Sequence, residues 1–326
     1  MKHHQSVGPL AAGEVEFFER EGYLVVRDLF SDRELEPVIK AISGEIDRRA
    51  AEFVAQGKLS RTYEEYGFEE RLAQINAENK QFPKTIWDYQ VVLPEFFDLM
   101  TNKKLLDVAE QFCGEELIAS SVYRLRPKVP SHKWSPVPWH QDGGYLEPYC
   151  DPATILTFWV PLVDATEENG CLWLTPGMHK GPILPHHPDD RKHYLVIEES
   201  EFGGRAPECV PVPKGGVLMF HNRTPHCSYE NKTNKVRWSM DLRYQAASLP
   251  TNAQISRLPG ESLPSPEDGV PVACHPPEPD FLVRSRLRPD EVMKTQQAFI
   301  DLRKNHVPVE ITDRWGFTTS GRPDKI

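Results

Sequence analysis

The sequence predicts a mainly β protein with added helices: a double-stranded β-helix (jelly-roll, cupin-like) core flanked by N-terminal helices. Apolar residues recur at helical spacing up to about residue 115, and from residue 117 short extended runs alternate with turn residues. The 30 prolines of the 326-residue chain concentrate after residue 125, where they favour short strands and shaped loops. We expect a single domain with a helical part over about 1–115, a jelly-roll core over about 116–246 and a C-terminal extension over about 247–326.

The helical part has clear start and stop signals. Ser31, with Glu34 three residues later, forms a capping box that opens a helix, and Pro37 either kinks this helix or marks a later start. In order, we expect helix 14–21 ended by Gly22, strand 23–26, helix 31–48, helix and loop over 51–80, and one helix from Pro94 to Gly114.

The second half of the chain is dominated by short β-prone runs. We expect strands over 118–125, 153–162, 171–174, 210–212, 217–220 and 236–244. Residues 246–280 are rich in Pro, Ser and Asn and show no periodicity, and Pro289 begins a last helix that reaches about Leu302. From its position, the region after residue 250 is expected to form a lid or an oligomer contact.

Composition restricts the partners and the compartment. A formal net charge of −10 argues against nucleic acid, and no run of about 18 apolar residues predicts a membrane span. The six cysteines are scattered without a CxxC pair, and the first 13 residues lack the apolar stretch of a secretory signal. We therefore expect a cytoplasmic protein, and the composition leaves the oligomeric state open.

The strongest chemical signal is the triplet His140-Gln141-Asp142, which follows a β-prone Val-Pro-Trp run. On an extended strand, residues i and i+2 point to the same side, so the imidazole and the carboxylate reach one point while Gln141 turns away. A second imidazole would complete the facial 2-His-1-carboxylate set of non-haem Fe(II) oxygenases. Alone, the triplet is weak evidence of a metal site.

The second imidazole must come from the segment 220–228, which offers His221 and His226. We expect His226 to lie on a strand that forms an antiparallel hairpin with the strand carrying Arg237, eleven residues later. Such a hairpin would place a fixed guanidinium near the metal, where it suits a dicarboxylate because arginine pairs with carboxylates bidentately.

These residues resemble the phytanoyl-CoA dioxygenase family of Fe(II)/2-oxoglutarate oxygenases in their order and spacing over about 100 to 130 residues. The resemblance rests on the following motifs: His140-Gln141-Asp142, Asn169-Gly170-Cys171-Leu172, Pro176-Gly177-Met178-His179-Lys180-Gly181, Gly215-Gly216-Val217 through Phe220-His221, His226-Cys227-Ser228, Asn231 and Arg237. The helical region fits the family more loosely, and no family motif lies beyond about residue 250.

The resemblance implies the cofactors and the roles of single residues. It makes His140, Asp142 and His226 the iron ligands. Arg237 and Ser228 would bind the distal carboxylate of 2-oxoglutarate, with Trp159 beside it; Lys84 is the nearest match to a further lysine contact. Fe(II), 2-oxoglutarate and O₂ would together hydroxylate a small organic metabolite, releasing succinate and CO₂. Alternatives are an idle jelly roll that binds a metal or ligand, and an oxygenase that carries out desaturation or ring chemistry. Asp142 disfavours halogenation, for which related enzymes replace the carboxylate by a small residue.

Several other residues are interpreted structurally. His221 and His179 are expected to be structural, whereas four loop histidines are expected to be solvated: His132, His186, His187 and His193. Cys227 should alternate away from the metal, and the flanking aromatic residues Trp134, Trp139 and Tyr145 serve equally well as core or as pocket walls. Arg124, Arg126 and Lys128 leave coenzyme A possible, but the acidic balance favours a smaller metabolite.

Overall fold

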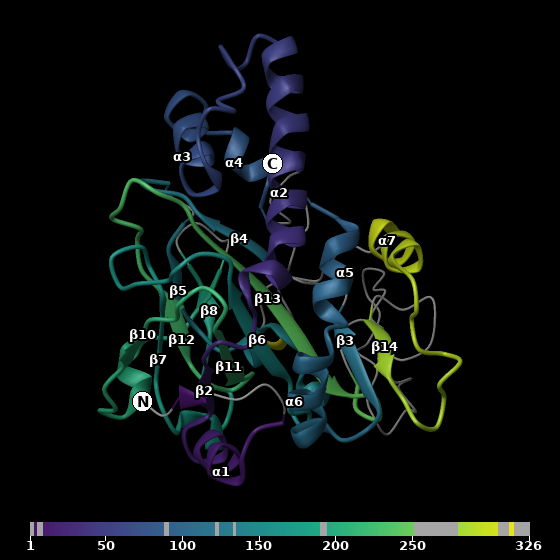
Figure 1. Ribbon diagram of the computed structural model, residues 1–326. Helices are drawn as coiled ribbons and strands as arrows, with labels where there is room; N and C mark the ends of the chain where they lie inside the picture. The colour runs from purple at the N-terminus through teal and green to yellow at the C-terminus, as the bar shows by residue number, and fades with distance from the viewer. Residues whose placement is uncertain are drawn as a thin grey trace.

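A computed structural model describes residues 3–4, 9–87, 91–120, 124–132, 135–189, 194–250, 280–305 and 313–315 (Figure 1). Seven α-helices lie within these ranges: α1 Ala12–Glu21, α2 Asp32–Ala55, α3 Phe68–Glu78, α4 Phe82–Thr85, α5 Pro94–Met100, α6 Lys103–Cys113 and α7 Gln296–Asn305. In this part of the chain no helix combines the length and the apolarity that crossing a membrane requires.

Two of the predicted helix ends are confirmed by the structure, and two helix predictions are wrong. Gly22 ends α1 with φ 77°, and the Ser31 amide donates to Glu34 Oε2 at 2.9 Å to open α2. The single helix expected over 94–114 is wrong: the chain breaks it into α5 and α6 because the Asn102 side chain caps a new helix, accepting from the Lys104 amide at 2.9 Å. The last helix, α7, begins later than Pro289, since the residues before it form turns.

Two antiparallel sheets form the β core. The major sheet has the strand order β1-β2-β11-β6-β13-β3-β14 with β4 also paired to β13, the minor sheet has the order β10-β7-β12-β5, and β8 pairs with β9 alone. Among the described strands, only β1 and β2 pair in parallel. The strands are β1 His3–His4, β2 Tyr23–Val26, β3 Leu117–Ser120, β4 Arg124–Lys128, β5 Val137–His140, β6 Leu156–Pro161, β7 Leu172–Leu174, β8 His187–Pro188, β9 Leu195–Val196, β10 Glu208–Val210, β11 Val217–His221, β12 His226–Ser228, β13 Arg237–Ala246 and β14 Asp280–Arg284. The jelly-roll prediction is confirmed.

The major sheet extends beyond the stretch 116–246. β2, from the helical part, pairs with β11, and β14, from the C-terminal extension, pairs with β3 (Figure 1). The apolar run Tyr23–Val26 is fully buried in this position, which explains why an isolated strand stands among helices. Segments from both ends of the chain therefore complete the sheet.

Strand β13 separates the core from the site. Its even-numbered residues from Trp238 to Tyr244 are at most 1 % exposed and face the helices, where Trp238 stacks on Phe68 with ring centroids 4.9 Å apart. The Tyr244 hydroxyl donates to the Met100 carbonyl at 2.6 Å on the same side. Because side chains alternate along a strand, the polar odd-numbered residues lie on the opposite, inner face: Arg237, Ser239, Asp241 and Arg243.

Candidate metal and 2-oxoglutarate site

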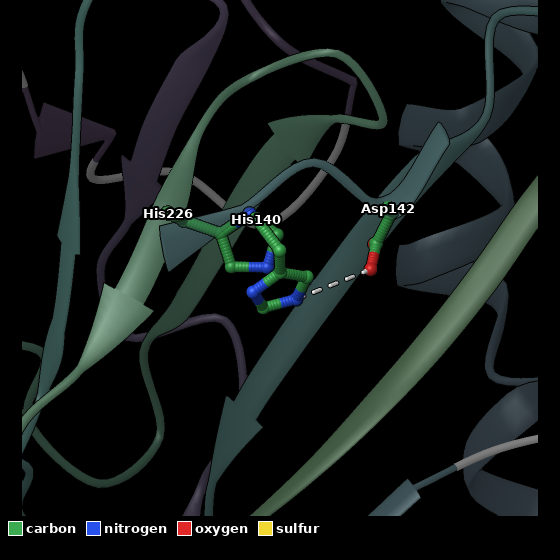
Figure 2. A group of neighbouring side chains, drawn as sticks. All are labelled: His140, Asp142 and His226. Carbon is green, nitrogen blue, oxygen red and sulfur yellow. Dashed lines mark ion pairs between the residues drawn. The ribbon is translucent and has the colours of Figure 1, made fainter. Parts of the chain in front are cut away.

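Two imidazoles meet across the pairing of β5 and β12. His140 and His226 are direct partners in the antiparallel register, and their ring centroids lie 4.2 Å apart with an angle of 50° between the planes (Figure 2). The register shifts between His226 and Ser228, so β12 bends just after the histidine. Both histidines are buried, at 8 % and 6 % exposed.

Each imidazole is fixed by its own backbone. His140 Nδ1 lies 2.8 Å from the Pro138 carbonyl, and His226 Nδ1 lies 3.0 Å from the Thr224 carbonyl. A carbonyl only accepts, so in both rings Nδ1 carries the proton and Nε2 keeps its lone pair. Metal-binding histidines use this arrangement, in which a partner on one ring nitrogen orients the other toward the metal.

Asp142 reaches the pair by a route that differs from the expected one. β5 ends at His140, and Asp142 opens a 3₁₀ turn, η2, over Asp142–Tyr145. The expectation of one continuous strand is wrong, because the Gly143 amide leaves the sheet and donates to the Asn222 carbonyl at 2.8 Å. Asp142 Oδ1 still lies 4.0 Å from His140 Nε2, and one ligand atom from each of the three residues falls within 4.8 Å of the others (Figure 2).

Two residues of the major sheet hold the Asp142 carboxylate. The Thr157 hydroxyl of β6 donates to Oδ2 at 2.7 Å. Arg243 of β13 donates from Nη2 to Oδ1 at 3.0 Å and from Nε to Oδ2 at 3.3 Å. Burial alone would raise the pKa of Asp142, but the charge and the hydrogen bonds of Arg243 hold this pKa well below its usual range. The residue is therefore a carboxylate at neutral pH.

The two imidazoles are neutral at the same pH. Burial is the main cause that lowers the pKa of His140 well below its ordinary value, with the neighbouring His226 adding to it. Burial also lowers the pKa of His226, against the opposing pull of Asp142. Two neutral imidazoles and one carboxylate are the protonation states that a divalent metal requires of its ligands.

Arg237 occupies the inner face of the major sheet, 2 % exposed. Its Cζ lies 5.0 Å from the centroid of the Trp159 ring, and Nη1 donates to Ser239 Oγ at 2.5 Å. The expected hairpin between the strands of His226 and Arg237 is wrong: β12 belongs to the minor sheet and β13 to the major sheet, so the two face each other across the core. Burial lowers the pKa of Arg237 to about 10, which leaves the guanidinium charged at neutral pH.

Lys128 links Arg237 to Ser228. Its Cα is the cross-strand partner of Arg237, and its fully buried Nζ lies 3.3 Å from the Ser228 carbonyl and 2.8 Å from the Tyr229 carbonyl. Burial, followed by the charge of Arg237, lowers the pKa of Lys128 well below its ordinary value. Lys84 lies on α4, which packs against α3, and its contact with 2-oxoglutarate stays a prediction.

The remaining histidines divide into three groups. His221 lies on the major sheet, where its Nδ1 accepts from the Arg223 amide at 3.0 Å, and His179 Nε2 lies 3.1 Å from the Glu19 carbonyl. His187 is exposed as expected, but the expectation of solvated rings is wrong for His132 and His186, which are 5 % and 4 % exposed. Both rings pack against a tryptophan instead, Trp87 and Trp315 respectively. His193 lies outside the described residues.

The residues that flank the candidate ligands lie in different surroundings. Cys227 points away from the imidazoles into an apolar cluster with Trp139, and burial raises the pKa of its thiol to about 12. Tyr145, in contrast, meets the His140 ring edge-on at 5.7 Å. Trp134 lies outside the described residues.

Sequence reasoning missed Thr157 and Arg243, the two residues that hold Asp142. The signal was present in β13, where polar residues recur at every second position of an otherwise apolar strand: Arg237, Ser239, Asp241 and Arg243. In a strand buried on both faces such a row marks contact with a polar site. Only the first member of the row was recognised.

The residues present fit both cofactors that the sequence implied. Two free Nε2 lone pairs and one carboxylate form the donor set of a non-haem Fe(II) centre. The Nε atom of Arg237 is buried without a hydrogen-bond partner among the described residues, an arrangement that an anionic ligand would complete.

Comparisons with known proteins agree with this fold. The epimerase SnoN of nogalamycin biosynthesis, solved with Fe³⁺, alpha ketoglutarate and nogalamycin RO, matches with a TM-score of 0.53 and 20 % identity over 83 % of this chain and 98 % of that chain. At this identity the likeness shows the fold alone. The Bos taurus peroxisomal phytanoyl-CoA dioxygenase is 26 % identical over 251 residues, covering 73 % of this chain and 69 % of that protein.

A second relative is the probable alpha-ketoglutarate-dependent hypophosphite dioxygenase of Stutzerimonas stutzeri, 26 % identical over 70 % of this chain and 76 % of its own length. Fold, donor set and relatives define a 2-oxoglutarate-dependent non-haem iron dioxygenase, which uses Fe(II), 2-oxoglutarate and O₂. The phytanoyl-CoA dioxygenase (PhyH) family model matches residues 18–239, about two thirds of the chain. The chain belongs to this family.

Proposed function

We propose that the protein hydroxylates a small organic metabolite, with His140, Asp142 and His226 as ligands of Fe(II). The observation that carries the proposal is the convergence of the three ligand atoms within 4.8 Å, together with a buried arginine, Arg237, whose Nε has no hydrogen-bond partner among the described residues. In this proposal Arg237 and Ser228 bind the distal carboxylate of 2-oxoglutarate, and Trp159 packs beside it.

The chain's own residues prepare the site in three ways. Pro138 and Thr224 fix the tautomers of the two imidazoles, so both Nε2 atoms are ready to donate. Thr157 and Arg243 hold the Asp142 carboxylate in one orientation and favour its charged form. A metal ion held by these three residues would have coordination positions left for the co-substrate and O₂.

The iron and 2-oxoglutarate supply the oxidising power when bound, and the co-substrate leaves as succinate and CO₂. The protein's part is to orient the molecules and exclude water. Arg237 offers a buried, charged guanidinium, whose pairing with a carboxylate is strong because it is shielded from solvent. The indole of Trp159 covers one face of that guanidinium and keeps its direction fixed.

A small metabolite is favoured over a coenzyme A thioester. Of the three basic residues that the sequence offered for coenzyme A phosphates, Lys128 is 2 % exposed and occupied by backbone carbonyls, and Arg126 Nε lies 3.6 Å from the Asp241 carboxylate. One relative of this chain is named as a probable hypophosphite dioxygenase, that is, for a small substrate, which supports this preference. We place the protein in the cytoplasm, supported by its five free cysteines among the described residues.

The test measures succinate release from 2-oxoglutarate, first without O₂ and then with O₂, over a panel of small metabolites. Turnover that requires Fe(II), 2-oxoglutarate and O₂, and that Asp142→Ala abolishes, is the expected result. A product that gains one hydroxyl group distinguishes hydroxylation from desaturation or ring formation. Absence of turnover across the panel together with absence of 2-oxoglutarate binding would reject the proposal and leave an idle metal-binding jelly roll.

A further inference from the structure

We infer that Trp315, near the C-terminus, is a positioning residue for the iron centre: it acts through His186 on the Gln141–Gly144 backbone that carries Asp142. The inference rests on the proposed assignment of Asp142 as an iron ligand. Trp315 lies in η8, Asp313–Trp315, outside the residues that the family model matches, so neither the motifs nor the family pointed to it.

Trp315 contacts both the turn that carries Asp142 and the His186 ring beside that turn. Its Nε1 donates to the Gly144 carbonyl at 2.9 Å, two residues after the ligand. Its ring packs on the imidazole of His186, with centroids 5.2 Å apart and planes 31° from parallel. The two partners in the first contact are 171 positions apart in the sequence, so this is a long-range closure of the chain onto η2.

His186 carries the contact to the other side of Asp142. Its Nδ1 lies 2.7 Å from the Leu184 carbonyl, so Nδ1 bears the proton and Nε2 accepts from the Gln141 amide at 3.1 Å. That amide belongs to the residue between His140 and Asp142. Burial lowers the pKa of His186 to about 4, which agrees with a neutral ring that accepts a hydrogen bond.

The His186 ring is packed closely against the backbone of η2. A Cβ at Gly144 would lie 2.4 Å from the imidazole, so only glycine fits between η2 and this ring. The Gln141 side chain fixes the same segment, accepting from the Leu184 amide at 2.7 Å and donating to the Arg223 carbonyl at 2.6 Å. The His186 ring therefore contacts the backbone before and after Asp142, at Gln141 and Gly144, and the Trp315 ring packs against it as well.

Arg314 anchors Trp315 in this position. It pairs with both oxygens of Asp151, Nη1 to Oδ1 at 2.5 Å and Nη2 to Oδ2 at 2.7 Å, and it packs on the Trp315 ring with Cζ 5.1 Å from the centroid. This is a bidentate ion pair, and the Arg314 side chain is only 12 % exposed. A bidentate pair fixes the orientation of the guanidinium as well as its position. Arg314 and Trp315 together therefore hold the His186 ring against the turn that carries Asp142.

The test measures Fe(II) affinity under anaerobic conditions, with Mn(II) as a redox-inert second probe, together with the thermal midpoint of the metal-free protein. Trp315→Ala is expected to weaken metal binding about 10-fold, the range found when an outer partner of a ligand is lost. Trp315→Phe keeps the ring on His186 and loses only the N–H, so it should recover part of this affinity. Arg286, also in the extension, forms an exposed ion pair with Glu115, so Arg286→Ala is the matched control and should leave affinity unchanged.

A double variant with His186→Asn decides whether Trp315 acts through His186. If it does, adding Trp315→Ala to His186→Asn causes little further loss of metal affinity, because contacting residues are not additive. Equal Fe(II) affinities for wild type, Trp315→Ala and Arg314→Gln, whatever happens to their thermal midpoints, would reduce Trp315 to a structural contact and overturn the inference. Metal affinity needs no turnover, so an inactive wild type that showed the same affinity losses would reject the proposed function and leave this inference standing.

Discussion

The two sheets contribute differently to the site. The minor sheet supplies both imidazoles from two paired strands, and each ring is oriented by a carbonyl two residues earlier in its own strand or loop. The major sheet supplies no imidazole to the group; instead β6 and β13 provide the hydroxyl and the guanidinium that hold Asp142, and β13 also provides Arg237. Among the described residues, Asp142 is the one residue of the three whose side chain is held by hydrogen bonds from the major sheet.

The difference separates local from long-range organisation. A histidine oriented by its own backbone needs only a few residues to be in place. Asp142 needs partners that lie 15 and 101 positions away in the sequence, so its orientation depends on the finished fold. Substitutions in the two sheets should therefore affect metal binding and co-substrate binding by different amounts.

The largest effect is expected from the minor sheet. His226→Ala removes one of two paired imidazoles and should weaken Fe(II) binding by more than about 100-fold, beyond the loss caused by an outer partner. Anaerobic titration of Fe(II) into the metal-free protein measures it. His221→Ala removes a histidine of similar burial from the major sheet and should leave binding measurable; the reverse result would mean that His221 is the ligand.

Arg237→Gln should separate the two cofactors. Loss of a buried charged partner costs about 2–5 kcal/mol, so the half-saturating concentration of 2-oxoglutarate should rise about 30-fold or more. Fe(II) affinity without 2-oxoglutarate should change little, since the imidazoles lie on the other sheet. Arg71→Gln is the matched control, because Arg71 is also buried, at 7 % exposed, but lies on α3. An equal loss of metal and co-substrate affinity would contradict the separation.

Thr157→Val tests whether the major sheet reaches the metal through Asp142. The substitution keeps the shape and removes the hydroxyl that donates to Oδ2, so Fe(II) affinity should fall about 10-fold. Thr175→Val provides the comparison: Thr175 is fully buried, and its hydroxyl has no hydrogen-bond partner among the described residues. If both valine variants bind Fe(II) alike, the Thr157 hydroxyl does not orient the ligand.

The smallest effect concerns pH and the metal-free protein. Burial lowers the pKa of His140, His179, His186, His221 and His226 below the ordinary 6.5, to about 4 for His186 and about 3 for His221. Below about pH 6.5 the histidines of the unfolded chain become protonated while the buried rings of the folded chain stay neutral. The free energy of unfolding is therefore highest above pH 6.5 and falls as the pH drops toward 4. Each group contributes a slope of at most about 1.4 kcal/mol per pH unit.

Urea unfolding of the metal-free protein at pH 7.5, 6.5 and 5.5 measures this slope. His221→Asn keeps an acceptor for the Arg223 amide and removes one titrating ring, so its slope should be smaller than that of the wild type. Unfolding free energies that do not change over this interval would show that the buried rings are not held neutral.

The sequence predicted the parts of the molecule that depend on local pattern. The strand 23–26, the Ser31 cap and the change to short strands near residue 117 follow from spacing and capping chemistry, and all agree with the structure. The three residues of the candidate metal site were also predicted, by their spacing and by family resemblance. The structure brings them together.

The errors concern relations between distant segments. A break at Asn102 needs only one side-chain cap, but whether the chain uses it depends on how α5 and α6 pack. The expected hairpin between His226 and Arg237 failed because six polar or charged residues in between allow the chain to cross from one sheet to the other, and sequence spacing alone does not separate these cases. His186 was expected to be exposed to solvent because local sequence does not reveal its contact with Trp315, which lies 129 positions later in the chain.

The orientation of the two imidazoles has a consequence for metal exchange. Because each ring is locked by a carbonyl of its own segment, both donors are in place before the metal arrives, and their ordering entropy is lost during folding rather than during binding. Exchange of the metal should then be governed by Asp142, whose release requires Thr157 and Arg243 to give way. The residence time of iron could thus be tuned from β6 and β13 without altering a single ligand.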